Sequence, residues 1–153
     1  MPTSGAFPAS RRHPQFNRDA LSATLARSGI AYVHLPELGG RREPLPGSAN
    51  TGWREAGFRG YADYMNTEAF AEGMLRLCAS AAEGRTAILC AEKDWRGCHR
   101  GLISDCLKVR GFAVVHLLDV GKTEAHPYTK AARLHDGVLS YSAEAPAQSR
   151  LDL

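Results

Sequence analysis

The spacing of apolar residues along the chain predicts alternating helices and strands. Apolar positions recur at helical spacing in DALSATLARSG (residues 19–29), where Asn17 is placed to cap the start and Gly29 the end. Helical spacing also predicts a short helix at 61–65 and further helices at 67–84, 99–111 and 128–134. Short apolar and β-branched runs predict strands at 30–35, 85–90, 112–119 and 138–142.

This order of elements indicates the fold class. Mostly apolar strands that alternate with helices are typical of βαβ units, in which a parallel sheet is buried on both faces. The sequence therefore predicts an α/β fold: a small, open, mostly parallel sheet flanked by helices. We expect a single domain over residues 1–141, followed by a polar, flexible tail at 142–153.

Composition and charge narrow the function classes. Hydrophobic residues make up 44% of the 153 residues and charged residues 23%, as in soluble globular proteins. The net charge of +3 is too small to predict a nucleic-acid binder or a membrane-surface protein. No apolar run approaches the roughly 20 residues of a membrane span, and the N-terminus lacks the apolar core of a signal peptide. We therefore expect a cytoplasmic protein with no membrane partner and four reduced cysteines.

Two loops carry the candidate chemistry. Ligands of open α/β sheets bind beyond the carboxyl ends of the strands, where the predicted loops 36–53 and 91–100 would converge. The second loop opens a helix, whose first N–H groups and dipole favour anions and thiolates. The sequence thus predicts an anion-binding or thiol site for a small anionic ligand. Its residues would be Cys90, Glu92, Cys98, His99 and Arg100, with Gly39, Gly40 and Arg41 from the facing loop.

If the protein is an enzyme, these residues divide the work by their chemistry. Cys98 or Cys90 would be the nucleophile or a metal ligand, and His99 the acid or base. Arg100 would anchor the anion, because a guanidinium holds a carboxylate or phosphate by two contacts. Glu92 would act as an acid or base or orient the arginine. The sequence names neither the substrate nor a cofactor.

Other functions fit the same residues. A metal could be bound by Cys90, Cys98 and His99, with Glu92 or His116 as the fourth ligand, because thiolate and imidazole suit zinc or iron. Cys90 followed by Arg96 has the spacing of cysteine-headed phosphate loops, although the acidic Glu92 and Asp94 would repel phosphate. A packed loop without chemistry is a third interpretation. A nucleic-acid-associated module would use four arginines: Arg11, Arg12, Arg41 and Arg42.

The remaining candidates fit structural roles better. Cys78 and Cys106 lie on apolar helical faces, where core packing is the expected role. His116 lies inside an apolar strand and is expected to be a core histidine with satisfied hydrogen bonds. Four aromatic residues are expected to pack the long loop onto the domain: Trp53, Phe58, Tyr61 and Tyr64.

Several motifs together resemble a known family. FPASRRHPQFN (7–17), AYVHLPELGGRR (31–42), FRGYADYM (58–65), LCAEKDWRGCHRGLIS (89–104) and VVHLLDVG (114–121) resemble the domain of unknown function 488 family over roughly residues 7–141. Cys-Ala-Glu followed by Cys-His-Arg is the most specific of these motifs. The resemblance implies an α/β fold in the cytoplasm, and a DNA-repair link for some members.

The resemblance also implies an N-terminal unit that this chain lacks. Family members usually begin with a strand bearing Ile-Gly-His-Ser, a helix, and a strand ending in Asp-Val-Arg. Here MPTSGAF stands in place of Asp-Val-Arg. If the family's site uses that histidine or aspartate, the resemblance implies either an inactive protein or a start assigned too late.

Overall fold

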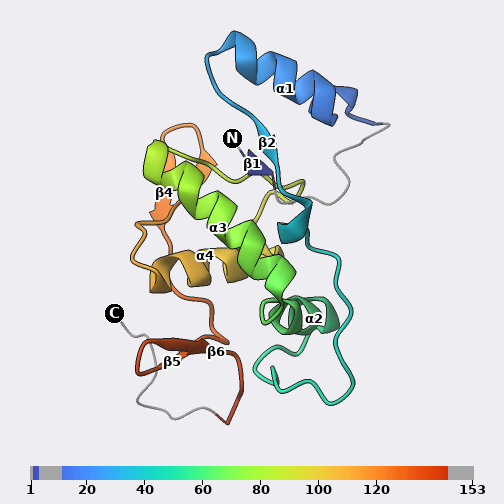
Figure 1. Cartoon of the computed structure of the whole chain (residues 1–153), viewed down its shortest axis with the longest axis vertical. Coiled ribbons are helices and arrows are strands. Elements are labelled where there is room, and N and C mark those ends of the chain that lie inside the picture. The colour runs from blue at the N-terminus through green and yellow to red at the C-terminus, as the bar shows by residue number, and fades with distance from the viewer. Residues whose placement is uncertain (1, 4–11, 145–153) are drawn as a thin grey trace. The chain divides into compact units, whose positions relative to one another are not determined.

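The computed structural model describes residues 2–3 and 12–144 as two compact units. Of the described residues, 2–3, 12–40 and 68–91 form the first unit, and 41–67 and 92–144 form the second. Figure 1 shows the elements of both units. The predicted single domain over 1–141 stays a prediction, and residues 145–153 of the predicted tail lie outside the described residues.

In the first unit, helix α1 (Arg18–Arg27) ends where the sequence predicts. The Gly29 N–H donates to Ala26 O, and the Ile30 N–H donates to Leu25 O. Gly29 has a φ of +74°, a left-handed conformation in which a glycine avoids the strain of a Cβ. These two bonds satisfy carbonyls that the end of a helix otherwise leaves unpaired. The short helix η1 (Pro14–Phe16) precedes α1.

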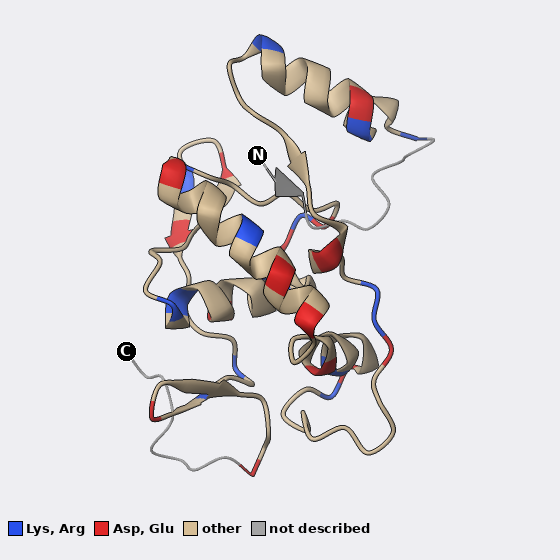
Figure 2. Ribbon diagram, viewed as in Figure 1, with Lys and Arg blue, Asp and Glu red and all other residues tan. Residues whose placement is uncertain are grey.

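Helix α3 (Glu68–Glu83) forms the core of the first unit. Its buried face consists of Phe70, Gly73, Met74 and Leu77, and the 3₁₀ helix η2 (Pro36–Leu38) packs on this face. Gly73 allows the close approach, because a Cβ there would lie 2.9 Å from Leu38 Cδ2. The exposed face of α3 carries Glu68, Glu72 and Arg76 (Figure 2). Apolar and charged positions thus separate at helical spacing, as predicted.

The second unit contains helices and two antiparallel hairpins. Its helices are α2 (Ala56–Tyr64), the 3₁₀ helix η3 (Trp95–Gly97) and α4 (Arg100–Val109). One hairpin pairs β3 (Val115–Asp119) with β4 (Lys122–Ala125), and the other pairs β5 (Arg133–His135) with β6 (Val138–Ser140). Among the described residues, the large apolar side chains buried in this unit are Tyr61, Trp95, Leu102, Ile103, Leu107 and Tyr141.

The predicted parallel sheet is wrong. Among the described residues, the parallel pairing is that of β1 (Pro2–Thr3) with β2 (Val33–His34), two residues each. The apolar run at 85–90 contains one bridge residue, Leu89, and no ladder. The run at 112–119 turns back on itself, because Gly121 adopts a φ of +70° and lets β4 pair with β3. The short apolar runs are therefore not assembled into a mostly parallel sheet flanked by helices.

The predicted helix at 128–134 is also wrong, since residues 133–135 form β5. The missed signal is the Asp136-Gly137 pair, which has φ values of +50° and +78°. Two consecutive left-handed residues make the two-residue turn typical of hairpins, and Asp-Gly is a preferred sequence for it. The predicted strand at 138–142 is present as Val138–Ser140. The predicted short helix at 61–65 begins earlier, at Ala56.

No helix within the described ranges is long and apolar enough to cross a membrane.

Alanine substitution should have opposite effects on stability at two glycines of α2. A Cβ at Gly60 would collide with the backbone of the preceding loop at Arg42 O and, at 2.6 Å, Glu43 C. Gly60→Ala should lower the free energy of unfolding by an amount in the upper part of the roughly 1–3 kcal/mol range of overpacking. Gly57 faces open space, so Gly57→Ala should raise it by about 0.5–1 kcal/mol. Urea denaturation measures both, and equal effects of the two variants would contradict the packing of the loop on α2.

Candidate functional site

Cys98 is the best-defined member of the predicted site. It lies between η3 and α4, and a capping interaction sets its position: the Asp94 side chain accepts the Arg96 N–H at 3.0 Å and starts η3. The Cys98 N–H then donates to Trp95 O at 3.3 Å and ends that helix. Two residues later α4 begins, so the Cys98 sulfur lies at the N-terminus of a ten-residue helix.

Two donors from one arginine point at this sulfur. The Arg100 backbone N–H and its guanidinium Nε–H each donate to Cys98 Sγ at 3.4 Å. The side chain is buried, with 4% of its surface exposed. Hydrogen bonds, a nearby guanidinium and a helix N-terminus all favour the charged form of a thiol. Burial acts in the opposite direction, because desolvation disfavours a charged sulfur.

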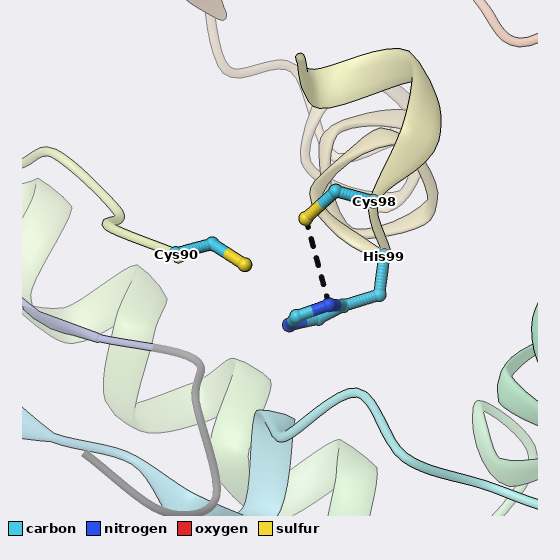
Figure 3. A group of neighbouring side chains, drawn as sticks. All are labelled: Cys90, Cys98 and His99. Atoms are coloured by element: carbon cyan, nitrogen blue, oxygen red, sulfur yellow. Dashed lines mark hydrogen bonds between the residues drawn. The ribbon is translucent and has the colours of Figure 1, made fainter. Parts of the chain in front are cut away.

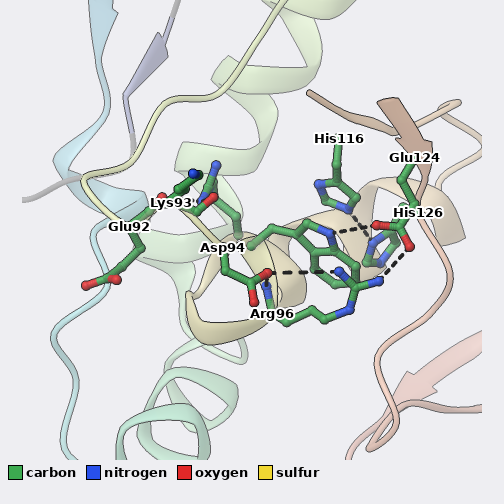
Figure 4. Close-up of polar contacts among 9 residues, drawn as sticks. Glu92, Lys93, Asp94, Arg96, His116, Glu124 and His126 are labelled. Atoms are coloured by element: carbon green, nitrogen blue, oxygen red, sulfur yellow. Dashed lines mark hydrogen bonds and ion pairs between the residues drawn. The ribbon is translucent and has the colours of Figure 1, made fainter. Parts of the chain in front are cut away.

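Arg100 also closes the loop that contains the motif. Its Nη2 donates to Glu92 O at 2.5 Å and to Lys93 O at 3.4 Å. Two of the three guanidinium nitrogens are thus engaged by the sulfur and by loop carbonyls. Glu92 contributes its carbonyl to this closure, while its carboxylate is exposed and points away from the labelled neighbours (Figure 4).

His99 lies beside the sulfur, where α4 begins. Its Nδ1 is 3.6 Å from Cys98 Sγ (Figure 3), and its ring lies 5.2 Å from the ring of Tyr61. Burial, and then the neighbouring Tyr64, raises the pKa of Tyr61 well above its ordinary value, so this phenol is neutral at physiological pH. His99 is therefore held against a neutral aromatic side chain with one ring nitrogen facing the thiol.

The same spacing suits metal ligation. A zinc ion lies about 2.3 Å from a thiolate and about 2.0–2.1 Å from an imidazole nitrogen, so tetrahedral ligands of these kinds are about 3.6 Å apart. The Sγ and Nδ1 of this adjacent Cys–His pair have that separation. Cys98 and His99 can therefore face one ion, although they are neighbours in the sequence.

The other predicted residues are distributed over both units. Cys90, Gly39 and Gly40 belong to the first unit, and Arg41 is an exposed residue of the second. Arg12 is exposed, and Arg11 lies outside the described residues. The guanidinium of Arg42 lies over the Tyr64 ring, 3.6 Å from its centroid. The site whose geometry is described is accordingly the second-unit group of Cys98, His99 and Arg100.

Arg96, which would hold the anion in a cysteine-headed phosphate loop, is bound to other side chains. It pairs with the Glu124 carboxylate and lies 4.4 Å from the Trp95 ring centroid (Figure 4). The hydrogen bond from Arg96 lowers the pKa of Glu124. Trp95 Nε1–H donates to the same carboxylate at 3.3 Å. These contacts do not favour the cysteine-headed phosphate loop, because its arginine would have to face a bound anion.

Sequence reasoning missed a buried polar chain that begins at Asp105. This carboxylate has no exposed surface, and four donors reach it from residues 126–141. They are His126 Nε2 at 2.8 Å, Thr129 N at 2.9 Å, Thr129 Oγ1 at 2.6 Å and Tyr141 Oη at 2.8 Å. Burial, and then the charge of Asp105, raises the pKa of Tyr141 well above its ordinary value, so it stays a donor. The available signal was an aspartate within the largely buried sequence GLISDCL.

The chain continues through two histidines. His126 Nδ1 lies 2.8 Å from His116 Nε2, and the His116 ring stacks on Trp95 with centroids 4.1 Å apart (Figure 4). When a neutral His126 donates its Nε2 proton to Asp105, its Nδ1 is an acceptor and the His116 Nε2–H donates to it. His116 is therefore a buried histidine with a partner, as the sequence predicts.

Comparison with known proteins identifies a family. A family model described as Domain of unknown function DUF488 matches residues 5–107. No curated protein and no solved structure matches the chain. The matched range includes every residue of the Cys-Ala-Glu and Cys-His-Arg motifs.

The lowered pKa of His116 predicts that the folded protein loses stability in acid. Burial, and then the neighbouring His126, lowers the pKa of His116 to about 4, whereas an unfolded histidine titrates near 6.5. As the pH falls from about 6.5 to about 4, the unfolded chain takes up this proton first, so stability falls. The contribution is at most about 3 kcal/mol, reduced by solvent screening.

Urea denaturation between pH 7.5 and pH 4 measures this effect. His116→Gln should show a shallower fall of the free energy of unfolding with pH, whatever its stability at pH 7.5. His135→Gln is the control, because His135 is in a hairpin and half of its side chain is exposed. Equal slopes for wild type and His116→Gln would contradict the assignment.

Proposed function

The chain belongs to the family of the domain of unknown function DUF488, and from this premise we propose that its function is carried by the thiolate of Cys98. The observation that carries the proposal is the pair of Arg100 N–H donors on a buried sulfur at the start of α4. A thiolate is the nucleophilic form of cysteine and also its metal-binding form. The proposal therefore concerns one charged sulfur with two chemical uses.

In the first use, Cys98 is a nucleophile. His99 Nδ1 lies 3.6 Å from the sulfur, where it can accept the thiol proton. Arg100 acts through Cys98 and is a positioning residue, because its donors stabilise the sulfur and its Nη2 holds the loop carbonyls. The anion that this loop stabilises is then the thiolate of Cys98. A substrate anion would bind afterwards, next to the thiolate.

The other predicted participants keep their place as predictions. We still expect the remaining motif residues to belong to the anion-binding or thiol site: Cys90, Glu92, Gly39, Gly40 and Arg41. The arginines of the nucleic-acid interpretation gain no support from their contacts, since Arg42 lies on Tyr64.

The pH dependence of Cys98 alkylation tests the thiolate. Peptide mass spectrometry after timed iodoacetamide treatment follows each cysteine separately. The midpoint of the rate profile for Cys98 should lie at lower pH in the folded protein than in urea, where an unperturbed thiol titrates near pH 8.5. The midpoint is the informative quantity, because burial slows the reaction at every pH. Coincident midpoints in folded and unfolded protein would reject the proposal.

Matched variants assign the effect to Arg100. Arg100→Gln should move the Cys98 midpoint up towards its value in urea, and Arg100→Lys should move it less, because lysine keeps the charge. Arg110→Gln should leave it unchanged, since Arg110 is exposed at the far end of α4. If Arg110→Gln shifts the midpoint as much as Arg100→Gln, general electrostatics rather than these hydrogen bonds would explain the thiolate.

A second candidate function is metal binding, which the 3.6 Å separation of Cys98 Sγ and His99 Nδ1 favours. Cobalt(II) added to the reduced protein should give a thiolate-to-cobalt absorption band that saturates at one equivalent. Cys98→Ser and His99→Gln should each abolish the band, and Cys78→Ser in α3 should leave it intact. Cys90→Ser asks whether the other thiol of the motif is required. Absence of the band would exclude this candidate and leave the nucleophile.

A further inference from the structure

A depression of about 490 Å³ lies in the second unit, away from the cysteine motif. Its lining comes from the loop before α2 and from α2 itself and includes Leu45, Thr51, Trp53, Arg54 and Arg59. The volume is that of a small-molecule site. We propose that this depression binds a small molecule that joins an oxyanion group, such as a phosphate, to a flat apolar ring.

Two arginines supply the positive charge. Arg59 Nη1 donates to Trp53 O and Arg54 O, both at 3.2 Å, which fixes the guanidinium against the loop. A guanidinium fixed by one nitrogen loses less freedom when the others bind an oxyanion. Arg54, on the same rim, is exposed. The residues that line the depression include no Asp or Glu.

Trp53 supplies an apolar wall. Its Nε1 is buried and has no hydrogen-bond partner among the described residues. The indole ring is braced by Phe58, with centroids 4.9 Å apart, and by Tyr141 at 5.8 Å. Leu45 extends the apolar side of the depression and is 64% exposed.

The neighbouring acid, Asp63, does not cancel this charge pattern. Its oxygens accept the Leu45 N–H at 2.8 Å and the Ser48 hydroxyl and Asn50 amide, both at 2.6 Å. Burial works to raise the pKa of Asp63, but these hydrogen bonds outweigh it and lower the pKa, so the carboxylate is ionised. The one carboxylate near the depression is therefore directed at loop donors, and the two arginines leave a net positive charge there.

The loop is held before any ligand binds. The Gly52 N–H donates to Tyr141 O at 2.8 Å, and the Ala143 N–H donates to Thr51 Oγ1 at 3.0 Å. A Cβ at Gly52 would lie 2.7 Å from Tyr141 O, so glycine is needed for this approach. These bonds connect the rim to the β6 end of the chain and hold Trp53 and the arginines together, which reduces the entropy lost on binding.

The test uses the indole N–H signals of nitrogen-15-labelled protein. The sequence has two tryptophans, and Trp53→Phe assigns the signal. Phenyl phosphate should shift the Trp53 indole signal in a saturable titration. The Trp95 indole, which donates to Glu124, should not follow the same curve. Benzyl alcohol, with the ring but no charge, and inorganic phosphate, with the charge but no ring, should each bind at least about tenfold more weakly.

Variants and contrary outcomes make the test decisive. Arg59→Gln and Arg54→Gln should each weaken phenyl phosphate binding, by about tenfold for Arg59. Arg54→Gln guards against loop disruption, and Arg27→Gln in α1 is the unchanged control. Equal binding of benzyl alcohol, equal binding of inorganic phosphate, or unaltered affinity in both arginine variants would overturn the proposal. Cys98→Ser should bind phenyl phosphate normally, so failure here and failure of the thiolate proposal are separate results.

Discussion

The second unit depends on one buried carboxylate. Asp105 has no exposed surface, and removing a charge from water is costly unless hydrogen bonds replace the lost solvation. Four donors reach it, and all come from the segment 126–141, which contains the β5–β6 hairpin. The carboxylate therefore requires this segment to fold against α4. Thr129 takes part through both its backbone N–H and its hydroxyl, which fixes this point of the segment on α4.

The same polar chain supports the loop that presents Cys98. Asp105 orients His126, His126 contacts His116, and His116 stacks on Trp95. The carbonyl of Trp95 accepts the Cys98 N–H. The sulfur is thus connected through packed and hydrogen-bonded groups to the most buried charge of this unit. Arg100 and Asp94 complete the arrangement locally, and neither needs a distant partner to place the thiol.

Local signals predicted the helices more reliably than the sheet. The end of α1 at Gly29, the apolar face of α3 and the start of α4 after Cys98 all follow from residues within one or two turns. A strand needs a partner, and an apolar run does not say which one. Residues 85–90 and 112–119 both have largely apolar sequences, yet the first contains a single bridge residue and the second supplies the first strand of a hairpin. The fold class depended on that choice and was therefore predicted wrongly.

The sequence by itself determined which residues lie at the start of a helix beside a thiol, because capping, helical spacing and the Cys-His-Arg order act over a few residues. The tertiary structure decided what those residues face. Arg100 faces the sulfur and two carbonyls, Arg96 faces Glu124, and the buried N–H of Trp53 has no partner within the described ranges. It also decided that Asp105 is buried, since its donors lie 21 to 36 residues away in the chain. Such contacts depend on the path of the chain through space, which local propensity does not specify.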